Sequence, residues 1–468
     1  MMTALNLQSA YAFAPYNGYT YDPNQKSVPS LNGYEPTRLI MSHDIGVSDM
    51  KSPKDFFVSE SLGRIYILDS GNGRVIILNA QYALEKTITR FTYQAKETAL
   101  NNPSSIFVTD AGEIYVADTA NNRVLKMDDS GRIEKIIVKP QTDMYPANVA
   151  FEPLKILVDK SDNIYILIKG LYQGTLVLTG SGEFSRFYAS AKVIPTIEVL
   201  NGMFWRLFMT KEQKEAQPDY VPTEFSGFDI DNEGFIYTVT QDKTTQMTLK
   251  KFNALGKSIA MNNDAFGDLE SQYDRENIVT QFIDVNVEEN FFVDTLDLTR
   301  GRVFRYDQDF NLLFIFGGPG GTQLGTFKTP AAVDNLGEDI LVLDSDLASI
   351  TVFSPTEFGR KVNTAISLYN SGDYLDAIEP WEEIVRLNEN YSLAYKGIGD
   401  GLFMTGRYKE AMDNYRLAND KESYLRAFRE YRNIVVRQSF PVIFAAVLLI
   451  LLFVTVGRML LKVRGRKR

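Results

Sequence analysis

Three carboxylates are the side chains of this chain that could act together in chemistry: Asp55, Glu224 and Asp284. Carboxylate oxygens are the ligands that Ca²⁺ prefers in proteins. Held around one axis by the surrounding strands, the three could bind Ca²⁺ for a hydrolytic reaction. No residue is assigned a catalytic role from the sequence, and the metal, if there is one, is unknown.

The composition excludes several other kinds of site. The chain has no cysteine, which removes disulfides, thiolate metal sites and a cysteine nucleophile. His43 is the only histidine, so a catalytic triad or a polyhistidine metal site would depend on that residue alone. The net charge of −10 disfavours nucleic acid as a partner, because nothing offsets repulsion by phosphates.

The elements that must position the carboxylates form a repeat. Segments 64–75 and 113–124 share Tyr, Asp, Asn and Arg at an offset of 49 residues, and each follows a strand that begins after a proline. Weaker copies follow near residues 153, 228, 297 and 330. A unit of short alternating strands cannot bury both faces alone, but units stacked radially cover one another. We therefore predict a mainly β six-bladed propeller over residues 15–355, with Asp55, Glu224 and Asp284 on its innermost strands.

The ends of the ring predict how it closes. The last unit ends near Phe353, which leaves no room for a fourth strand, whereas residues 37–42 form an orphan strand before the first unit. We expect that strand to complete blade 6 and remove the open edge. The Asp and Arg five residues apart in three units are expected to pair across the turn as fold residues: Asp69 with Arg74, Asp118 with Arg123, and Asp297 with Arg302.

An insertion interrupts the repeat between the third and fourth units. Residues 196–216 carry apolar side chains at helical spacing, which predicts an amphipathic helix. That helix could simply pack on the propeller. Alternatively it could dock a partner, with Phe204, Trp205 and Phe208 as the contact residues.

Residues 359–436 change to a helical period. Gly372, Tyr374, Ala377 and Trp381 recur as Gly406, Tyr408, Ala411 and Tyr415, every time 34 residues later. This pattern resembles the tetratricopeptide (TPR) repeat, which implies an all-α array of hairpins whose small residues let helices approach. Pro380 is expected to kink one helix, and a third helix over 422–436 to lead onward. The array could serve as a spacer or bind protein, with Trp381, Tyr408 and Tyr415 as docking candidates.

The C-terminal region predicts one membrane span over residues 440–461. Phe440–Val456 is free of charge, and Pro441 lies near its expected start. The basic tail, 462–468, places the C-terminus in the cytoplasm by the positive-inside rule. The propeller and the helical array would then be extracytoplasmic, and residues 1–14 would be the remnant of a signal peptide or a disordered N-terminus. The alternative is a tail-anchored scaffold in the cytoplasm.

The repeat that includes Tyr115, Asp118, Asn121 and Arg123 resembles the NHL repeat, a propeller family. The whole architecture resembles membrane-anchored NHL proteins of Gram-positive bacteria. That resemblance implies a cofactor-free, non-catalytic scaffold or binding protein, accessory to a carbohydrate ABC-transport system, with a transporter subunit or a glycan as partner and lipid around its one helix. The alternative is a hydrolase similar to Ca²⁺-dependent sugar lactonases.

Overall fold

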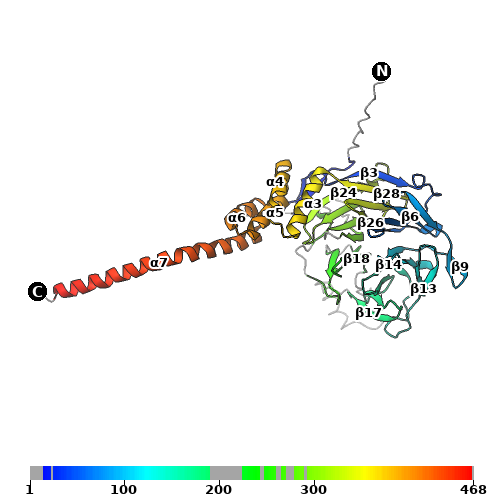
Figure 1. The fold of residues 1–468 in the computed structure, drawn as a ribbon, viewed down its shortest axis with the longest axis horizontal. Helices are drawn as coiled ribbons and strands as arrows, with labels where there is room; N and C mark the ends of the chain where they lie inside the picture. Colours follow the sequence, from blue (N-terminus) through cyan, green and yellow to red (C-terminus); the bar gives the residue numbers. More distant parts are fainter. Residues whose placement is uncertain are drawn as a thin grey trace, which may run out of the picture. The chain divides into compact units, whose positions relative to one another are not determined.

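The computed structural model divides into two units, Met1–Thr20 with Gln25–Gly359, and Tyr21–Asn24 with Arg360–Arg468. The first unit is built from strands and the second from helices (Figure 1). The residues that the structure describes are 14–22, 25–189, 224–242, 247–259, 265–269, 279–288 and 292–465.

The first unit contains six antiparallel sheets in chain order, as predicted for a six-bladed propeller. The innermost strand of each sheet contacts that of the next, and the last contacts the first, so the ring is closed. Blade 1 consists of β4 (Asp55–Ser59), β5 (Arg64–Asp69), β6 (Arg74–Asn79) and β7 (Leu84–Ile88). Blade 2 consists of β10 (Ser105–Val108), β11 (Ile114–Asp118), β12 (Arg123–Met127) and β13 (Ile133–Ile137). Blade 3 consists of β14 (Pro153–Val158), β15 (Ile164–Ile168), β16 (Thr175–Leu178) and β17 (Phe184–Tyr188).

The other three blades are less uniform. Blade 4 has three strands among its described residues, and blade 5 carries a short parallel addition, β25 (Thr326–Phe327). Blade 4 consists of β18 (Gly227–Ile230), β19 (Ile236–Val239) and β20 (Leu249–Phe252). Blade 5 consists of β21 (Phe282–Val287), β22 (Val293–Asp297), β23 (Arg302–Tyr306) and β24 (Leu312–Pro319). Blade 6 consists of β26 (Pro330–Leu336), β27 (Asp339–Asp344), β28 (Ser349–Pro355) and β3 (Tyr34–Met41). Two small sheets lie outside the blades: β1 (Tyr19–Tyr21) with β2 (Ser27–Pro29), and β8 (Phe91–Tyr93) with β9 (Lys96–Thr98).

Blade 6 is closed by the N-terminal strand, as the sequence predicts. β3 pairs antiparallel with β28, and Ile40 lies opposite Ile350. The strand begins three residues before the predicted 37–42 and ends one residue before it. Because β3 comes from one end of the ring and β28 from the other, their backbone hydrogen bonds fasten the circle shut.

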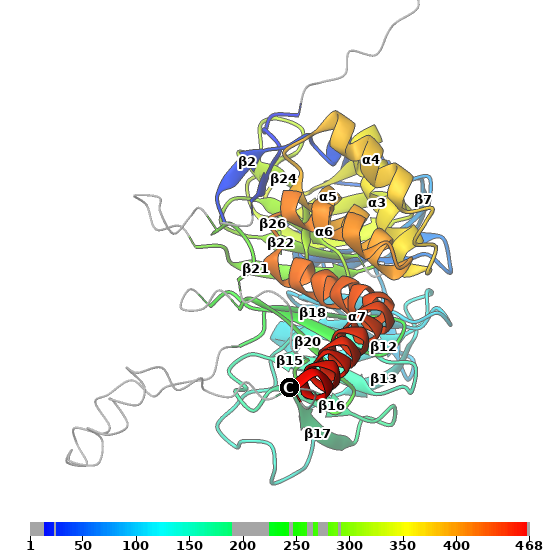
Figure 2. The same ribbon diagram turned by 90° about the vertical axis from the view of Figure 1, so that its left-hand side faces the viewer.

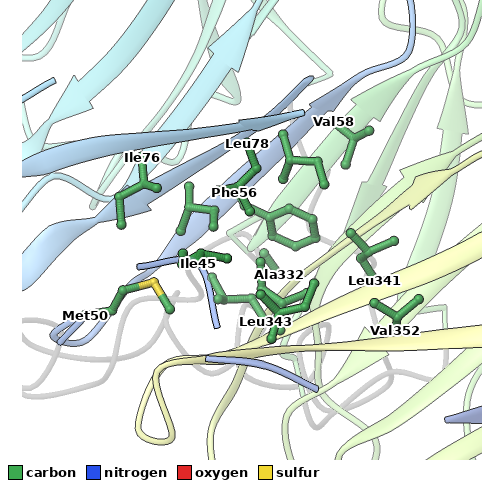
Figure 3. Packing of buried hydrophobic residues seen from close by; sticks show 14 residues of the cluster. Ile45, Met50, Phe56, Val58, Ile76, Leu78, Ala332, Leu341, Leu343 and Val352 are labelled. Atoms are coloured by element: carbon green, nitrogen blue, oxygen red, sulfur yellow. The ribbon is translucent and has the colours of Figure 1, made fainter. Parts of the chain in front are cut away.

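The core of the propeller lies between neighbouring blades. Phe56 of β4 and Leu78 of β6 meet Leu341 and Leu343 of β27 between blades 1 and 6 (Figure 3). Every residue of a middle strand such as β11 is buried, because a sheet covers each of its two faces. This packing explains why the middle strands have continuous apolar runs instead of simple alternation.

The Asp–Arg pairs of the first two blades stabilise the turn after each middle strand, as predicted. Arg74 Nε lies 2.6 Å from Asp69 Oδ2, and Arg123 Nε lies 2.7 Å from Asp118 Oδ2. Each turn is one 3₁₀ turn, η1 (Ser70–Asn72) or η2 (Thr119–Asn121), which ends on a residue with positive φ. Both aspartates are fully buried, so water cannot stabilise their negative charge. The arginine beside each aspartate balances that charge instead.

Blade 5 does not follow this pairing, and the prediction for Asp297 and Arg302 is wrong. Arg302 forms its ion pair with Asp268 and bonds the Tyr19 hydroxyl. Asp297 instead accepts hydrogen bonds from Gln281 N and the Thr299 hydroxyl. Asp268 therefore pairs with Arg302 in place of Asp297, the aspartate five residues earlier in the chain.

The second unit contains five helices among its described residues. The glycines of the repeated motif, Gly372 and Gly406, have positive φ, and a Cβ on either would meet no other atom, so they serve the turns and not the approach of helices. Close approach is provided by Gly397 of α5, where a Cβ would collide with the Trp381 ring. The helices are α3 (Glu357–Asn370), α4 (Ile378–Leu387), α5 (Ser392–Met404), α6 (Tyr408–Leu417) and α7 (Lys421–Gly465).

Both prolines of the helical region lie elsewhere in their helices than expected. Pro380 is the third residue of α4, where the first turn tolerates a missing N–H, so the expected kink is wrong. The predicted helix 422–436 and the predicted span are one helix, α7, and Pro441 is therefore in its interior and not near a start (Figure 2). The insertion 196–216 lies outside the described residues.

Within the described parts of the chain, one helix is long and apolar enough to cross a membrane. It covers Lys421–Met459, and its most apolar window has a mean hydropathy of 2.8 with none of that window buried. Side chains from Phe440 to Val456 are exposed on all sides of α7, which favours lipid and not protein as their surroundings. The structure is thus consistent with single-pass anchoring through α7.

Candidate functional site: the central channel

The centre of the propeller holds a cavity of about 730 Å³ that all six innermost strands line. Its lining begins at Asp55, Ser105 and Lys155 and continues along the same strands beyond their ends. The layer that contains Lys155 is therefore the floor of the cavity, and the turns that follow the innermost strands form its rim. Innermost strands all run from floor to rim, so side chains at equivalent positions form layers across the channel.

The floor is held by one lysine between two carboxylates. Lys155 Nζ lies 3.0 Å from Asp55 Oδ1 and 2.9 Å from Asp284 Oδ1. The three residues occupy equivalent positions on blades 3, 1 and 5, as their pairing to the middle strands shows. The ammonium therefore links alternate blades across the axis.

The charges at the floor shift one another's ionisation. Burial alone would lower the pKa of Lys155, but the charges of Asp284 and Asp55 outweigh that effect and raise it. Burial raises the pKa of Asp284 to about 6, since the Lys155 ammonium offsets only part of the desolvation and Asp55 adds repulsion. Lys155 is thus a permanent cation at this depth.

The next layer, two residues further along each strand, has two different halves. Blades 1 to 3 contribute apolar side chains, and the Phe57 and Phe107 rings lie 4.9 Å apart. Blades 4 to 6 contribute polar ones, among them Asp229 and Asp334. In ring order the layer is Phe57, Phe107, Leu157, Asp229, Asn286 and Asp334.

The two aspartates of this second layer resist ionisation. Burial raises the pKa of Asp229 to about 7, and the backbone N–H of Val287 offsets part of that effect. Burial also raises the pKa of Asp334 well above its ordinary value, and the charge of Asp229 adds to the shift. Neither carboxylate forms an ion pair with any residue that the structure describes.

The channel carboxylates also join successive blades. Each accepts a hydrogen bond from a backbone N–H on the innermost strand of the following blade, so these side chains help to close the ring. The bonds run from Ile106 N to Asp55 (2.9 Å), Val287 N to Asp229 (2.8 Å), Val333 N to Asp284 (3.1 Å) and Val58 N to Asp334 (2.7 Å).

The wall and rim of the cavity are strongly acidic. Among the described lining residues twelve are Asp or Glu, of which five are paired with a lysine or arginine, and two are lysines, Lys155 and Lys160. Lys155 is already engaged at the floor, and Lys160 bonds Asn232 at the rim. Field lines from one sign of charge concentrate in such a cleft, so the cavity attracts cations.

Two of the three predicted channel residues lie in the cavity. Asp55 and Asp284 are brought together through Lys155, but Glu224 is not in the lining, and that prediction is wrong. Glu224 lies beside a smaller pocket and accepts a hydrogen bond from Gly170 N. Gly227, three residues later, is the position equivalent to Asp55, and it has no side chain.

The arrangement does not favour the predicted Ca²⁺ site. No group of three potential metal-ligating residues occurs among the residues described. The Lys155 ammonium lies between Asp55 and Asp284, where a cation held by both would have to lie. Like charge would repel Ca²⁺ from this position.

The three predicted docking residues that the structure describes do not form an exposed surface. Trp381 and Tyr415 are buried in the helical unit, and the Tyr415 hydroxyl donates to Asp400 at 2.7 Å, so these two predictions are wrong. Tyr408 is half-buried against Phe403, with ring centroids 5.2 Å apart. The remaining candidates, Phe204, Trp205 and Phe208, lie outside the described residues.

Three channel residues were missed in the sequence: Lys155, Asp229 and Asp334. Lys155 follows Asp55 by 100 residues, twice the approximate repeat length, so aligning the repeats by register would have found it. Asp229 lies two residues after Gly227, and Asp334 lies two residues after Ala332. Because side chains alternate along a strand, each aspartate is on the same face of its strand as that earlier residue. Only the pairing of innermost with middle strands shows that they share a layer with Phe57.

Several solved structures match this chain over most of their own length. Virginiamycin B lyase from Staphylococcus aureus is 12% identical, with 73% of this chain and 88% of that chain covered and a TM-score of 0.39. Kuenenia stuttgartiensis hydrazine synthase is 12% identical, with 66% and 97% covered and a TM-score of 0.40. At such identities and TM-scores no conclusion about activity follows.

The sequence comparisons identify one repeat. No curated protein sequence matches the chain. The family model of the NHL repeat matches residues 100–127, which contain β10, β11 and η2 of blade 2 and the Asp118–Arg123 pair. The chain thus carries an NHL repeat in a six-bladed propeller.

Proposed function

We propose that this chain is a membrane-anchored, non-catalytic binding or scaffold protein whose propeller presents its channel mouth to a partner. The observation that carries the proposal is the engagement of both floor carboxylates by Lys155. A hydrolase of the kind considered from the sequence needs those carboxylates for a metal ion or for proton transfer. With both paired to a permanent cation, they serve the ring, and the open part of the cavity serves binding.

Anchoring follows from the exposed apolar part of α7. The proposal places the propeller and helices α3 to α6 outside the cytoplasm, because the basic residues 462–468 follow the apolar segment directly. The helices would act as a spacer of the TPR kind between the propeller and the membrane. In this arrangement the channel mouth faces ligands or proteins of the cell surface.

The partner in this proposal is a subunit of a carbohydrate ABC-transport system. This part rests on the resemblance of the whole architecture to membrane-anchored NHL proteins of Gram-positive bacteria. A glycan delivered by the same system is the alternative partner. Neither requires the propeller to perform a reaction.

Co-purification tests the partner. The full chain, tagged after residue 468, is solubilised from its native membrane in mild detergent, and the bound proteins are identified by mass spectrometry. We expect permease or solute-binding subunits of a carbohydrate transporter to be enriched over an unrelated single-pass protein with the same tag. Recovery of the chain without such subunits would contradict the transport proposal.

Protease accessibility tests the side of the membrane. In intact cells from which the wall has been removed, added protease should degrade the propeller and leave a tag at the C-terminus protected. Disruption of the membrane should then expose the tag. A propeller that is protected until disruption would favour the tail-anchored alternative.

A further inference from the structure

We infer that the channel mouth binds an organic cation, an ammonium or guanidinium group carried on an apolar stem. The inference deepens the proposed function, since it takes the propeller to be a binding module and names the ligand class. It rests on the different chemistry of the two halves of the second layer and on the closed floor beneath them. No ligand of this kind is assigned by the repeat or by the fold.

The polar half of the second layer lacks a counter-charge. Asp229 and Asp334 each accept two backbone hydrogen bonds, one on each oxygen, but neither contacts a cation within the part of the chain that the structure describes. Lys155, in the layer below, is committed to Asp55 and Asp284. Both side chains are half-buried and partly shielded from water, so two carboxylates without a cation on one wall favour a positive group from outside.

The apolar half of the layer narrows the class of that cation. Phe57 and Phe107 line the cavity in the half opposite the aspartates. A bare metal ion gains nothing from such a wall, since it needs oxygen ligands on all sides. A neutral sugar could lie against the rings but would leave the carboxylates uncompensated. An organic cation suits both halves of the layer. Its charge lies beside the aspartates and its apolar stem lies against the aromatic rings, whose faces also attract a cation.

The floor limits how far the cation can enter. The Lys155 ammonium repels a positive group, which therefore stops at the level of Asp229 and Asp334. Above this level the rim adds Glu60, Asp110 and Glu233, which attract a cation towards the opening. The volume of about 730 Å³ lies within the range of small-molecule sites. A small amine or the end of a basic side chain of a partner fits that space.

Calorimetric titration of the full chain tests the inference. The chain is placed in nanodiscs of phosphatidylcholine, which carries no net charge, and titrated at pH 8 with benzylammonium, with benzyl alcohol and with Ca²⁺. We expect benzylammonium to bind at least about tenfold more tightly than benzyl alcohol, because the alcohol keeps the ring and lacks the charge. The substitution Asp334→Asn, which keeps an acceptor for Val58 N, should weaken benzylammonium binding by about tenfold.

A matched control removes one negative charge elsewhere. Glu97 is exposed on β9 and does not line the cavity, so Glu97→Gln should leave the affinity for benzylammonium within about twofold. Circular dichroism of each variant shows whether the propeller is intact. Equal affinity for benzylammonium and benzyl alcohol, equal loss in both variants, or tighter binding of Ca²⁺ would each overturn the inference. None of these results bears on co-purification with a transporter, so the proposed function is tested separately.

Discussion

Lys155 Nζ lies 2.9 Å from Asp284 Oδ1 although blade 4 separates the two residues around the ring. The same nitrogen lies 3.0 Å from Asp55 on blade 1. Backbone hydrogen bonds and apolar packing join only neighbouring blades, whereas this lysine joins blades 1, 3 and 5 across the axis. The floor of the channel is therefore a brace for the ring as well as the lower limit of the cavity.

Substitution of the lysine should destabilise the propeller. In Lys155→Met the stem is retained, but Asp55 and Asp284 are left as two buried carboxylates without a cation. Breaking a buried pair from one side costs about 3–5 kcal/mol. We expect a large fall in the melting temperature of the full chain at pH 8, followed by circular dichroism in the strand region.

The pH dependence of this variant has a definite sign. Without the ammonium the folded-state pKa of Asp284 rises further above its unfolded value, so the destabilisation should shrink as the pH falls towards 5 and this carboxylate takes up a proton. The control is Lys160→Met, which removes an exposed lysine at the rim. If the two variants melt together, Lys155 does not brace the ring.

Asp229→Asn should stabilise the protein at high pH. The pKa of Asp229 is about 7 in the folded chain and near 4 when unfolded, so folding takes up a proton between these values. Stability from this group is therefore full below about pH 4 and falls as the pH rises through 7, by an amount on the order of 4 kcal/mol. The amide can still accept from Val287 N.

The measurement is the melting temperature of the wild-type chain and the variant at pH 5 and pH 8. We expect little difference at pH 5 and a higher melting temperature for Asp229→Asn at pH 8. A flat pH profile in the wild type would show that Asp229 ionises normally. A gain at pH 8 would be the mark of a carboxylate retained at the expense of stability, which suits a binding residue.

The repeat explains why the fold was predictable and part of the site was not. Tyr, Asp, Asn and Arg of blades 1 and 2 recur because a tight turn and a buried strand need them, so the motif shows where each middle strand ends. The channel residues lie on the innermost strands, whose sequences differ from blade to blade. Asp55 and Asp284 are charged residues beside apolar ones, but Glu224 fits the same description and lies three residues before the equivalent position.

Arg123→Gln should destabilise blade 2 by about 3 kcal/mol or more. The fully buried Asp118 would lose its cation and keep only the bonds from Asn101 N and Asn121 Nδ2. Arg132→Gln is the matched control, because its pair with Asp128 is exposed and such pairs contribute about 1 kcal/mol or less. Denaturant unfolding followed by circular dichroism compares the two, and similar losses would show that the buried turn pair is not special.

The docking residues show a second limit of sequence patterns. Trp381 and Tyr415 recur at a fixed offset, and recurrence is equally compatible with a binding surface and with a core. Gly397 and Gly399 of α5 decide the question, since a Cβ on either would collide with the Trp381 or Tyr415 ring. The partners of these aromatic residues are glycines, which leave no trace in an apolar pattern, so burial could not be read from spacing.

The closing strand provides a test of how the ring is fastened, through two neighbouring residues on opposite faces of β3. Ile40 is buried in the core between blades 6 and 1, whereas Leu39 is 40% exposed. Ile40→Ala should cost about 2–4 kcal/mol, because it removes core contacts and leaves a cavity. Leu39→Ala keeps the same backbone bonds to β28 and should cost about 1 kcal/mol or less.

Because β3 is the only strand in the described chain that pairs one end of the ring with the other, Ile40→Ala should also speed proteolysis after residue 41. Equal costs for the two substitutions would mean that β3 is held by its backbone bonds alone and that its apolar face does not help to close the propeller.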